Sequence, residues 1–212
     1  AGSRTPFVGA NSAFAKLSAV DLGKEAVRDA LARSGLPGSR VNHVVYGTVV
    51  SDTQAPNIAR EVGLAVLPKN VPAVSVSRAC ASANQAITGA AEMIEMGYAD
   101  VVVAGGGESL SRIPITASDR LSRSIVRAAK GKTLSRKVAA FRGLRPRDLV
   151  PVTPAIAEPS TGETMGEAAE RMAKENGISR EDQDGWALRS HRLATEGTRD
   201  GRLAQEVVSV YV

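Results

Sequence analysis

The feature that most constrains the fold of this chain is a regular alternation of apolar, β-branched segments with segments of helical periodicity from residue 18 to residue 104. The strand-like segments are residues 41–50, 71–77 and 98–104, and the helix-like segments are 18–34, the stretch after Pro56 and 80–96. Strands that alternate with helices in this way form a mostly parallel sheet whose crossover helices cover its faces. The sequence therefore predicts an α/β fold.

Several local signals support these elements. Ser18 is the predicted N-cap of the first helix, with Asp21 three positions later as in a capping box, and Gly35 predicts its end. The helix over 80–96 is nearly free of charge, so we expect it to be buried nearly all round. Three glycines at 105–107 follow a strand without the spacing of a phosphate-binding loop, and they predict a tight turn at the sheet edge.

The pattern changes after Glu108, and this change defines the predicted domains. We divide the chain into an α/β core of residues 1–108, an inserted, mainly helical domain of residues 109–204, and a last core strand at 205–212. Helices within the insertion are predicted at residues 119–130, 133–142, 164–176 and 180–198.

Cysteine usage and hydropathy exclude several classes of protein. The chain has 212 residues and one cysteine, which excludes an internal disulfide and a four-cysteine zinc site. We expect no metal site and an intracellular location. There is no run of about 18 apolar residues that could span a bilayer. The opening AGSRTPF lacks the apolar core of a secretory signal, and we expect a strand to have preceded it.

Cys80 is the candidate nucleophile because it lies between a predicted strand and a predicted helix. Amide groups at a helix N-terminus favour a thiolate, and the three small residues after Cys80 leave room for a thioester. Attack by a thiolate would give an acyl-enzyme that is still activated for transfer. The alternative is a small, buried core cysteine. The residues alone leave both interpretations open.

Five segments, in order along the chain, resemble motifs of the thiolase family. They are SRTPF, APNIAR, the nucleophile motif SRACASANQAI, GGGESLSRIPI, and the loop-domain start STGETMGEAAERMAKENGISREDQD. Three further segments, ACASANQA, LRPRDLVPVTPAIAEPSTGETMG and WALRSHRLA, resemble the β-subunit of the fatty-acid oxidation trifunctional complex and its bacterial relatives.

The resemblance implies a thiolase-type mixed sheet covered by helices, with an inserted helical loop domain and with the carboxy-terminal half of the fold absent. It implies an acyltransferase of fatty-acid β-oxidation that cleaves 3-ketoacyl-CoA with CoA to acetyl-CoA and a shortened acyl-CoA. Cys80 would carry the acyl group. Coenzyme A would be a substrate, so no cofactor is expected.

The resemblance also indicates what this chain lacks. The family keeps a histidine base, in a Gly-His-Pro motif, and a second cysteine in the second half of the fold. His43 and His191 lie in no such motif, and we interpret them as structural or surface residues. We therefore expect the chain alone to be inactive.

Met165, in TMGEAA, matches a position that lines the pantetheine and acyl tunnel, although a core methionine at a helix start explains it equally well. Thr164 stands where many thiolases have histidine, and Ser77 where most have asparagine, so the contacts made from those positions are not expected here. Asn57 and Arg60 match a region that the family uses at its dimer interface.

Positive charge is concentrated in residues 119–148, which contain ten Lys or Arg and two Asp or Glu. Apolar residues recur among these charges at Leu121, Ile125, Leu134, Val138 and Phe141. A basic amphipathic hairpin of this kind can bind an anionic membrane surface or a partner subunit, or steer CoA phosphates, and a solvated loop is the plain alternative. Nucleic acid is not expected, because aromatic side chains are scarce.

The expected partners are acyl-CoA and CoA, a second copy in a homodimer, and a hydratase/dehydrogenase α-subunit. The expected location is the bacterial cytoplasm, or the mitochondrion in a eukaryote, with membrane association through 119–148. Two alternative functions stay open. One is a biosynthetic acetoacetyl-CoA thiolase or another condensing enzyme of this fold, and the other is a non-catalytic thiolase-fold scaffold.

Overall fold

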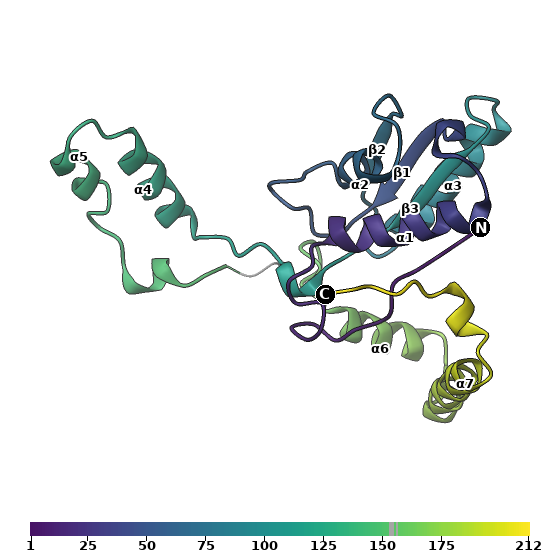
Figure 1. The fold of residues 1–212 in the computed structure, drawn as a ribbon. Coiled ribbons are helices and arrows are strands. Elements are labelled where there is room, and N and C mark those ends of the chain that lie inside the picture. Colours follow the sequence, from purple (N-terminus) through teal and green to yellow (C-terminus); the bar gives the residue numbers. More distant parts are fainter. Residues whose placement is uncertain (153–154, 156) are drawn as a thin grey trace. The chain divides into compact units, whose positions relative to one another are not determined.

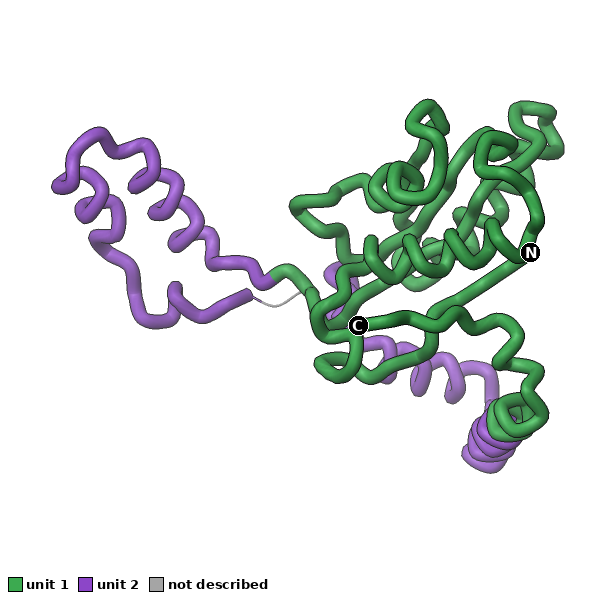
Figure 2. Tube along the Cα trace, in the orientation of Figure 1, with its two compact units in different colours: residues 1–114, 193–212 green, residues 115–192 purple. Residues whose placement is uncertain are grey.

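The computed structural model describes residues 1–152, 155 and 157–212. It divides the chain into two units (Figure 2). The first unit comprises Ala1–Pro114 with Leu193–Val212, and the second comprises Ile115–Arg192. The second unit lies inside the predicted insertion of residues 109–204.

The first unit is built on a three-stranded parallel sheet (Figure 1). The central strand β1 (His43–Gly47) pairs with β2 (Ala73–Val76) on one side and with β3 (Val102–Gly106) on the other. In this register Gly47 lies opposite both Val76 and Gly106, so the carboxyl ends of all three strands share one edge. The prediction of an α/β fold with a parallel sheet is confirmed.

Helices cover both faces of this sheet. They are α1 (Ala19–Ser34), α2 (Ile58–Val66) and α3 (Ser82–Glu95). Successive side chains of a strand point to opposite faces. Val44 and Tyr46 of β1 belong to the apolar core shared with α1 and α2. Gly47 points the other way, against Ser82 at the start of α3, so α3 covers the second face.

The first helix begins and ends as predicted. The Asp21 N–H donates to Ser18 Oγ at 3.1 Å, and the Ser18 N–H donates to the Asp21 carboxylate at 3.0 Å, which completes the capping box. Gly35 ends the helix with a left-handed φ of +67°.

The prediction that the third helix is buried nearly all round is wrong. Its buried residues are Ser82, Ala86 and Ala90, whereas Ile87 and Ile94 are 55% and 46% exposed. The buried positions recur every four residues, so they form one stripe along the helix. A three-stranded sheet covers only that stripe, and the other apolar side chains of this helix are open to solvent within this chain.

The predicted last strand at 205–212 is a single parallel bridge between Arg4 and Val207 in the structure. The Arg4 N–H donates to Glu206 O, and the Val208 N–H donates to Arg4 O, both at 2.9 Å. The next donor of a parallel ladder would be the amide of Pro6, and proline has no N–H. The ladder therefore stops after one residue pair.

The longer helices after residue 114 are α4 (Asp119–Lys130), α5 (Leu134–Ala139), α6 (Met165–Glu175) and α7 (Arg180–Arg199), and the last of them continues into the first unit. All four overlap their predicted ranges. Short 3₁₀ helices span Gly38–Arg40, Leu110–Arg112, Pro146–Leu149 and Leu203–Glu206. Three residues of the motif LRPRDLVPVTPAIAEPSTGETMG, at 153, 154 and 156, lie outside the described residues.

Helices α4 and α5 form the two arms of the basic hairpin, residues 119–148. An antiparallel bridge between Thr116 and Val152 closes its base. Ser118 Oγ, which also caps α4, donates to Asp148 O at 2.7 Å. Among the described residues, no helix has both the length and the apolar character that crossing a membrane requires.

Candidate functional site

Cys80 lies in the connection between β2, which ends at Val76, and α3, which begins at Ser82. Its side chain is exposed. The predicted position at a strand-to-helix junction is confirmed, and the alternative of a buried core cysteine is wrong. The role of Cys80 as a nucleophile stays a prediction at this point.

The turn that carries Cys80 is closed by hydrogen bonds around it. The Ala81 N–H donates to Arg78 O at 3.0 Å, and the Ser82 N–H donates to Ala79 O at 3.1 Å. The Ser82 hydroxyl accepts from the Arg78 N–H at 2.8 Å and donates to Ala79 O at 2.6 Å. These bonds define the backbone on both sides of the cysteine.

Two glycines allow the start of α3 to approach the carboxyl edge of the sheet. A Cβ on Gly47 would lie 2.6 Å from the Ser82 carbonyl carbon, and one on Gly106 would lie 2.9 Å from the Ala83 Cβ. Both distances are too short for carbon atoms that are not bonded, so a side chain at either position would push the helix away. The ends of β1 and β3 thereby determine where the turn with Cys80 lies.

Glu108 joins the loops that follow β1 and β3 at the same edge. Its carboxylate accepts hydrogen bonds from the Val49 N–H at 2.8 Å and from the Thr48 hydroxyl at 3.2 Å. Thr48 is buried, so these bonds to an ionised group are partly shielded from water. The prediction of a tight turn at 105–107 is wrong, because Gly105 and Gly106 belong to β3, where they pair with β1. Glu108 ties the loop after β3 to the loop after β1.

His43 is not near the cysteine. It begins β1 at the amino edge of the sheet, whereas Cys80 follows the carboxyl end of β2, which runs parallel to β1. This placement agrees with the interpretation of His43 as a structural residue. His191 belongs to the second unit, on α7. Within the described part of the chain, no group of three or more His, Cys, Asp or Glu side chains could hold a metal ion.

Met165 is the first residue of α6 and is 60% exposed, so it is not a core methionine within the second unit. Thr164 caps this helix through a capping box with Glu167. A backbone and a side-chain hydrogen bond from Thr164 lower the pKa of the Glu167 carboxyl. Met165 and Cys80 belong to different units, and the tunnel role of Met165 stays a prediction.

Asn57 and Arg60 make hydrogen bonds within the first unit. Asn57 Oδ1 accepts from the Ser75 hydroxyl at 2.8 Å, and Arg60 donates to Val71 O at 2.8 Å and Lys69 O at 2.9 Å. These bonds attach α2 to β2 and to the loop before it. A role for the two residues at a dimer interface stays a prediction.

Sequence reasoning missed the parts of the site that depend on long-range contacts. Gly47 lies inside the predicted strand 41–50, and the end of β1 at this residue appears only in the structure. Ser82 is one of the three small residues after Cys80, and its hydroxyl bonds to the turn before α3 instead of capping this helix. A capping signal would therefore not have identified its role.

Comparison with protein families and with named proteins finds thiolases in both cases. A family model described as "Thiolase, N-terminal domain" matches residues 1–212. The chain is 49% identical over 212 residues to proteins named 3-ketoacyl-CoA thiolase from Yersinia pestis (strain Pestoides F) and Yersinia pseudotuberculosis (strain YPIII). Each match covers 100% of this chain and 49% of the relative.

Solved structures of similar proteins include the acetyl-CoA acetyltransferase of Bacillus anthracis, with a TM-score of 0.81 and 28% identity. A thiolase from Ascaris suum in complex with coenzyme A matches with a TM-score of 0.79 and 30% identity. The matches cover 100% and 99% of this chain, and 50% of each solved chain. The chain thus spans about half the length of the relatives it matches.

Proposed function

Because the chain belongs to the thiolase family, whose amino-terminal domain model it matches from residue 1 to residue 212, we propose that it is the nucleophile-bearing half of a 3-ketoacyl-CoA thiolase. The observation that carries this proposal is the exposed Cys80 on a hydrogen-bonded turn just before α3, at the carboxyl edge of a parallel sheet. The 49% identity to proteins named 3-ketoacyl-CoA thiolase supports the substrate class.

The proposed reaction uses Cys80 twice. Its thiolate attacks the 3-keto carbonyl, the C2–C3 bond breaks, and acetyl-CoA leaves as an enolate that takes up a proton. The shortened acyl group stays on Sγ as a thioester. The thiol of a second CoA gives up its proton, attacks this thioester and restores the thiolate. Met165 is proposed to contact the pantetheine or acyl chain.

The test is acylation of the full-length protein by a 3-ketoacyl-CoA in the absence of free CoA. We expect mass spectrometry to find the shortened acyl group on the peptide that contains Cys80. Cys80→Ala should remove both this adduct and turnover, by about a thousandfold or more. Thr88→Ala, on the exposed side of α3, is the matched control and should acylate normally. Undiminished turnover in Cys80→Ala would exclude the proposal.

The 212-residue chain by itself should show no thiolysis, because neither of its histidines lies in a motif that resembles the family's catalytic base. His43 lies at the opposite edge of the sheet. Robust turnover by the isolated chain would contradict this part of the proposal.

The biosynthetic alternative has support from the acetyl-CoA acetyltransferase structure, but at a lower identity of 28%. Acyl-chain profiling of the full-length protein separates the two functions, because activity confined to acetoacetyl-CoA would favour the biosynthetic one. The scaffold alternative predicts that no 3-ketoacyl-CoA acylates Cys80. We favour the degradative thiolase, for which acylation of Cys80 is expected.

We further propose that the protein works as a homodimer in the bacterial cytoplasm, in fatty-acid β-oxidation, together with a hydratase/dehydrogenase α-subunit. The bacterial 3-ketoacyl-CoA thiolases among its relatives support this setting. Light scattering of the purified full-length protein tests the dimer, and a mass equal to one copy would contradict it. Copurification with the α-subunit expressed alongside tests the complex.

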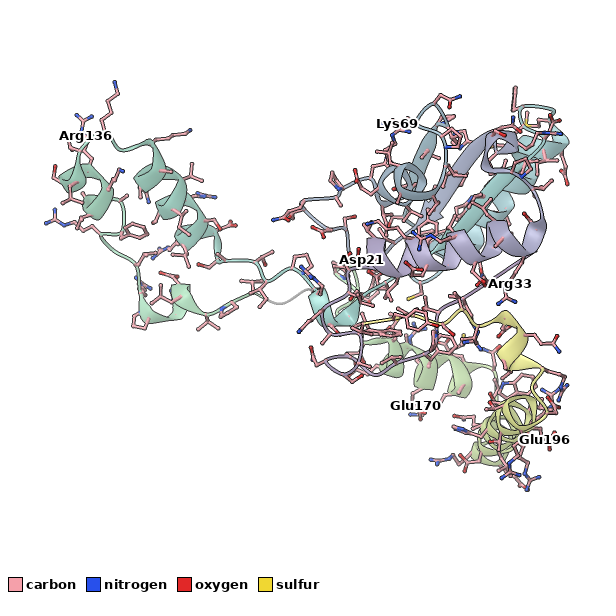
Figure 3. The ribbon with its side chains drawn as sticks, viewed as in Figure 1. Asp21, Arg33, Lys69, Arg136, Glu170 and Glu196 are labelled. Atoms are coloured by element: carbon pink, nitrogen blue, oxygen red, sulfur yellow. The ribbon has the colours of Figure 1, made fainter. Side chains whose placement is uncertain are left out.

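The basic hairpin, residues 119–148, is proposed to contact an anionic membrane surface. Its exposed apolar side chains are Ile125, Val126, Leu134, Val138 and Phe141. Basic side chains stand among them, and Figure 3 shows Arg136 of α5 extending from the hairpin into solvent. Apolar contact combined with positive charge is what binds peripheral helices to anionic lipids.

Sedimentation with vesicles tests the membrane contact. We expect the full-length protein to bind vesicles that contain anionic phospholipid and not vesicles of neutral phospholipid alone. Arg123→Glu with Arg127→Glu should reduce binding by about thirtyfold or more, since each basic residue near such a surface contributes about 1 kcal/mol. Arg199→Glu, exposed on α7, is the control. Equal binding of both variants would reject the contact.

A further inference from the structure

Ser82 differs from its surroundings in the turn that carries Cys80. Ala79 and Cys80 are exposed, whereas Ser82 is 3% exposed. A buried hydroxyl is unfavourable unless hydrogen bonds satisfy it. Here the hydroxyl makes two bonds, and both go to the backbone of the turn, at the Arg78 N–H (2.8 Å) and at Ala79 O (2.6 Å). The first residue of α3 therefore reaches back across the cysteine to the residues before it.

Ala79 holds a backbone conformation that an L-residue rarely adopts. Its φ is +45°, in the left-handed region, where the Cβ crowds the following carbonyl. The Ala79 carbonyl accepts two hydrogen bonds from Ser82, one from its N–H at 3.1 Å and one from its hydroxyl at 2.6 Å. Strain of this kind persists only where neighbouring groups hold it in place. Ser82 supplies these groups on the side of the helix.

The sheet fixes Ser82 in turn. Gly47 leaves just enough space for the Ser82 backbone, since a Cβ there would lie 2.6 Å from the Ser82 carbonyl carbon. A rigid strand end thus holds the serine, and the serine holds the strained residue next to the cysteine.

We propose that Ser82 is a positioning residue that keeps Ala79 left-handed and thereby holds Cys80 Sγ in the orientation for attack on the thioester substrate. The inference rests on the proposed function of Cys80. A misplacement of about 1 Å can slow an enzymatic step by about a hundredfold, because the reacting atoms must start close and aligned. Without the hydroxyl, only the Ser82 N–H still donates to the Ala79 carbonyl, so Ala79 relaxes toward the ordinary region of φ and the sulfur moves with it.

The experiment measures single-turnover acylation of Cys80 in the full-length protein at several substrate concentrations. Ser82→Ala should slow acylation at saturation by about tenfold or more, with the half-saturating substrate concentration little changed. Alkylation by iodoacetamide, which needs no alignment with a bound substrate, should change by less than about threefold. Thr88→Ala deletes an exposed hydroxyl of the same helix that donates to Gln85 O, and it should change neither rate.

A second-site rescue separates positioning from a general loss of packing. Glycine adopts positive φ without strain. Ala79→Gly in the Ser82→Ala background should therefore recover about threefold or more of the lost acylation rate. A cavity left by the hydroxyl would not be repaired by a change at an exposed neighbour.

The outcomes distinguish the two proposals. If Cys80→Ala abolishes acylation but Ser82→Ala acylates like Thr88→Ala, the positioning role is overturned and the proposed function stands. If Cys80→Ala is still acylated, the proposed function itself is overturned. Should Ser82→Ala not fold, the double variant with Ala79→Gly is measured in its place. A double variant that does not fold either, or that acylates no faster than Ser82→Ala, also rejects the positioning role.

Discussion

Gly47, the last residue of β1, and Ser82, the first residue of α3, meet backbone to backbone: a Cβ on Gly47 would lie 2.6 Å from the Ser82 carbonyl carbon and 2.7 Å from its oxygen. This contact joins the central strand to the helix that follows the candidate nucleophile. The position of Cys80 therefore depends on the absence of a side chain at Gly47, 33 residues earlier in the chain.

Gly47→Ala is expected to destabilise the protein by about 1–3 kcal/mol, because the added methyl group has no room without a shift of α3. Urea unfolding measures the change. Gly89→Ala is the matched control on α3, where nothing lies within 4 Å of an added Cβ. It should stabilise the helix by about 0.5–1 kcal/mol. Equal effects of the two substitutions would show that the contact with Ser82 is not tight.

Glu108→Gln tests the tie between the loops after β1 and β3. The carboxylate accepts from the Val49 N–H at 2.8 Å and from the Thr48 hydroxyl at 3.2 Å. A neutral amide of the same shape weakens these bonds, and we expect a loss of about 1–2 kcal/mol in the free energy of unfolding. Glu92→Gln, exposed on α3, is the control and should have almost no effect. A similar small effect at Glu108 would mean that the loops do not depend on it.

The capping box of α1 predicts a pH dependence. Burial acts to raise the pKa of Asp21, but hydrogen bonds from Ser18 and the nearby Lys24 outweigh it, and the pKa lies below its ordinary value of 3.8. The folded state therefore binds fewer protons than the unfolded state near this pH. The stability that Asp21 contributes is present at pH values above its ordinary pKa and is lost as the pH falls through its pKa in the folded protein.

Asp21→Asn should accordingly cost about 0.5–1 kcal/mol at neutral pH and almost nothing once Asp21 would be protonated in both states. The effect is small because the Asp21 side chain is 44% exposed and water screens its charge. Urea unfolding at a series of pH values measures the difference. Asp100→Asn, at an exposed position, is the control and should show no such pH dependence. A loss of stability in Asp21→Asn that persists in acid would contradict the lowered pKa of Asp21.

Most elements of the fold could be predicted because several local signals coincide at each of them. Ser18, Asp21 and Gly35 mark both ends of α1 by side-chain and backbone chemistry that acts within a few residues. Cys80 could be placed at a strand-to-helix junction for the same reason. These signals act within a few residues, so they can be recognised without knowing which elements pack against the helix.

The remaining features depend on contacts between distant residues. The exposure of Ile87 could not be predicted from a helix with so few charges, because burial depends on how many neighbours the sheet supplies. The strand at 205–212 looked regular, but its ladder is limited by Pro6 on the partner segment. The roles of Ser82 and Gly47 appear only once the sheet brings them together, since neither residue type is unusual at its position.

Tyr46 provides the last prediction, because it is 3% exposed and lies in the core among α1, α2 and the glycines at the end of β3. Burial raises the pKa of its phenol to about 12 from an ordinary value of 10.0. Above the ordinary value the unfolded chain releases this proton while the folded chain retains it. The corresponding stability is complete below that value and is lost as pH rises through the folded pKa, by up to about 2–3 kcal/mol.

Ultraviolet absorbance of the phenolate should therefore show one tyrosine that ionises late, near the alkaline unfolding of the protein. Tyr46→Phe should remove this late step and flatten the fall of stability in the alkaline range. Tyr98→Phe deletes an exposed phenol and should leave the late step unchanged. Loss of the late step in Tyr98→Phe rather than in Tyr46→Phe would show that the core around β1 admits water, and the packing of α1 and α2 over this strand would then be wrong.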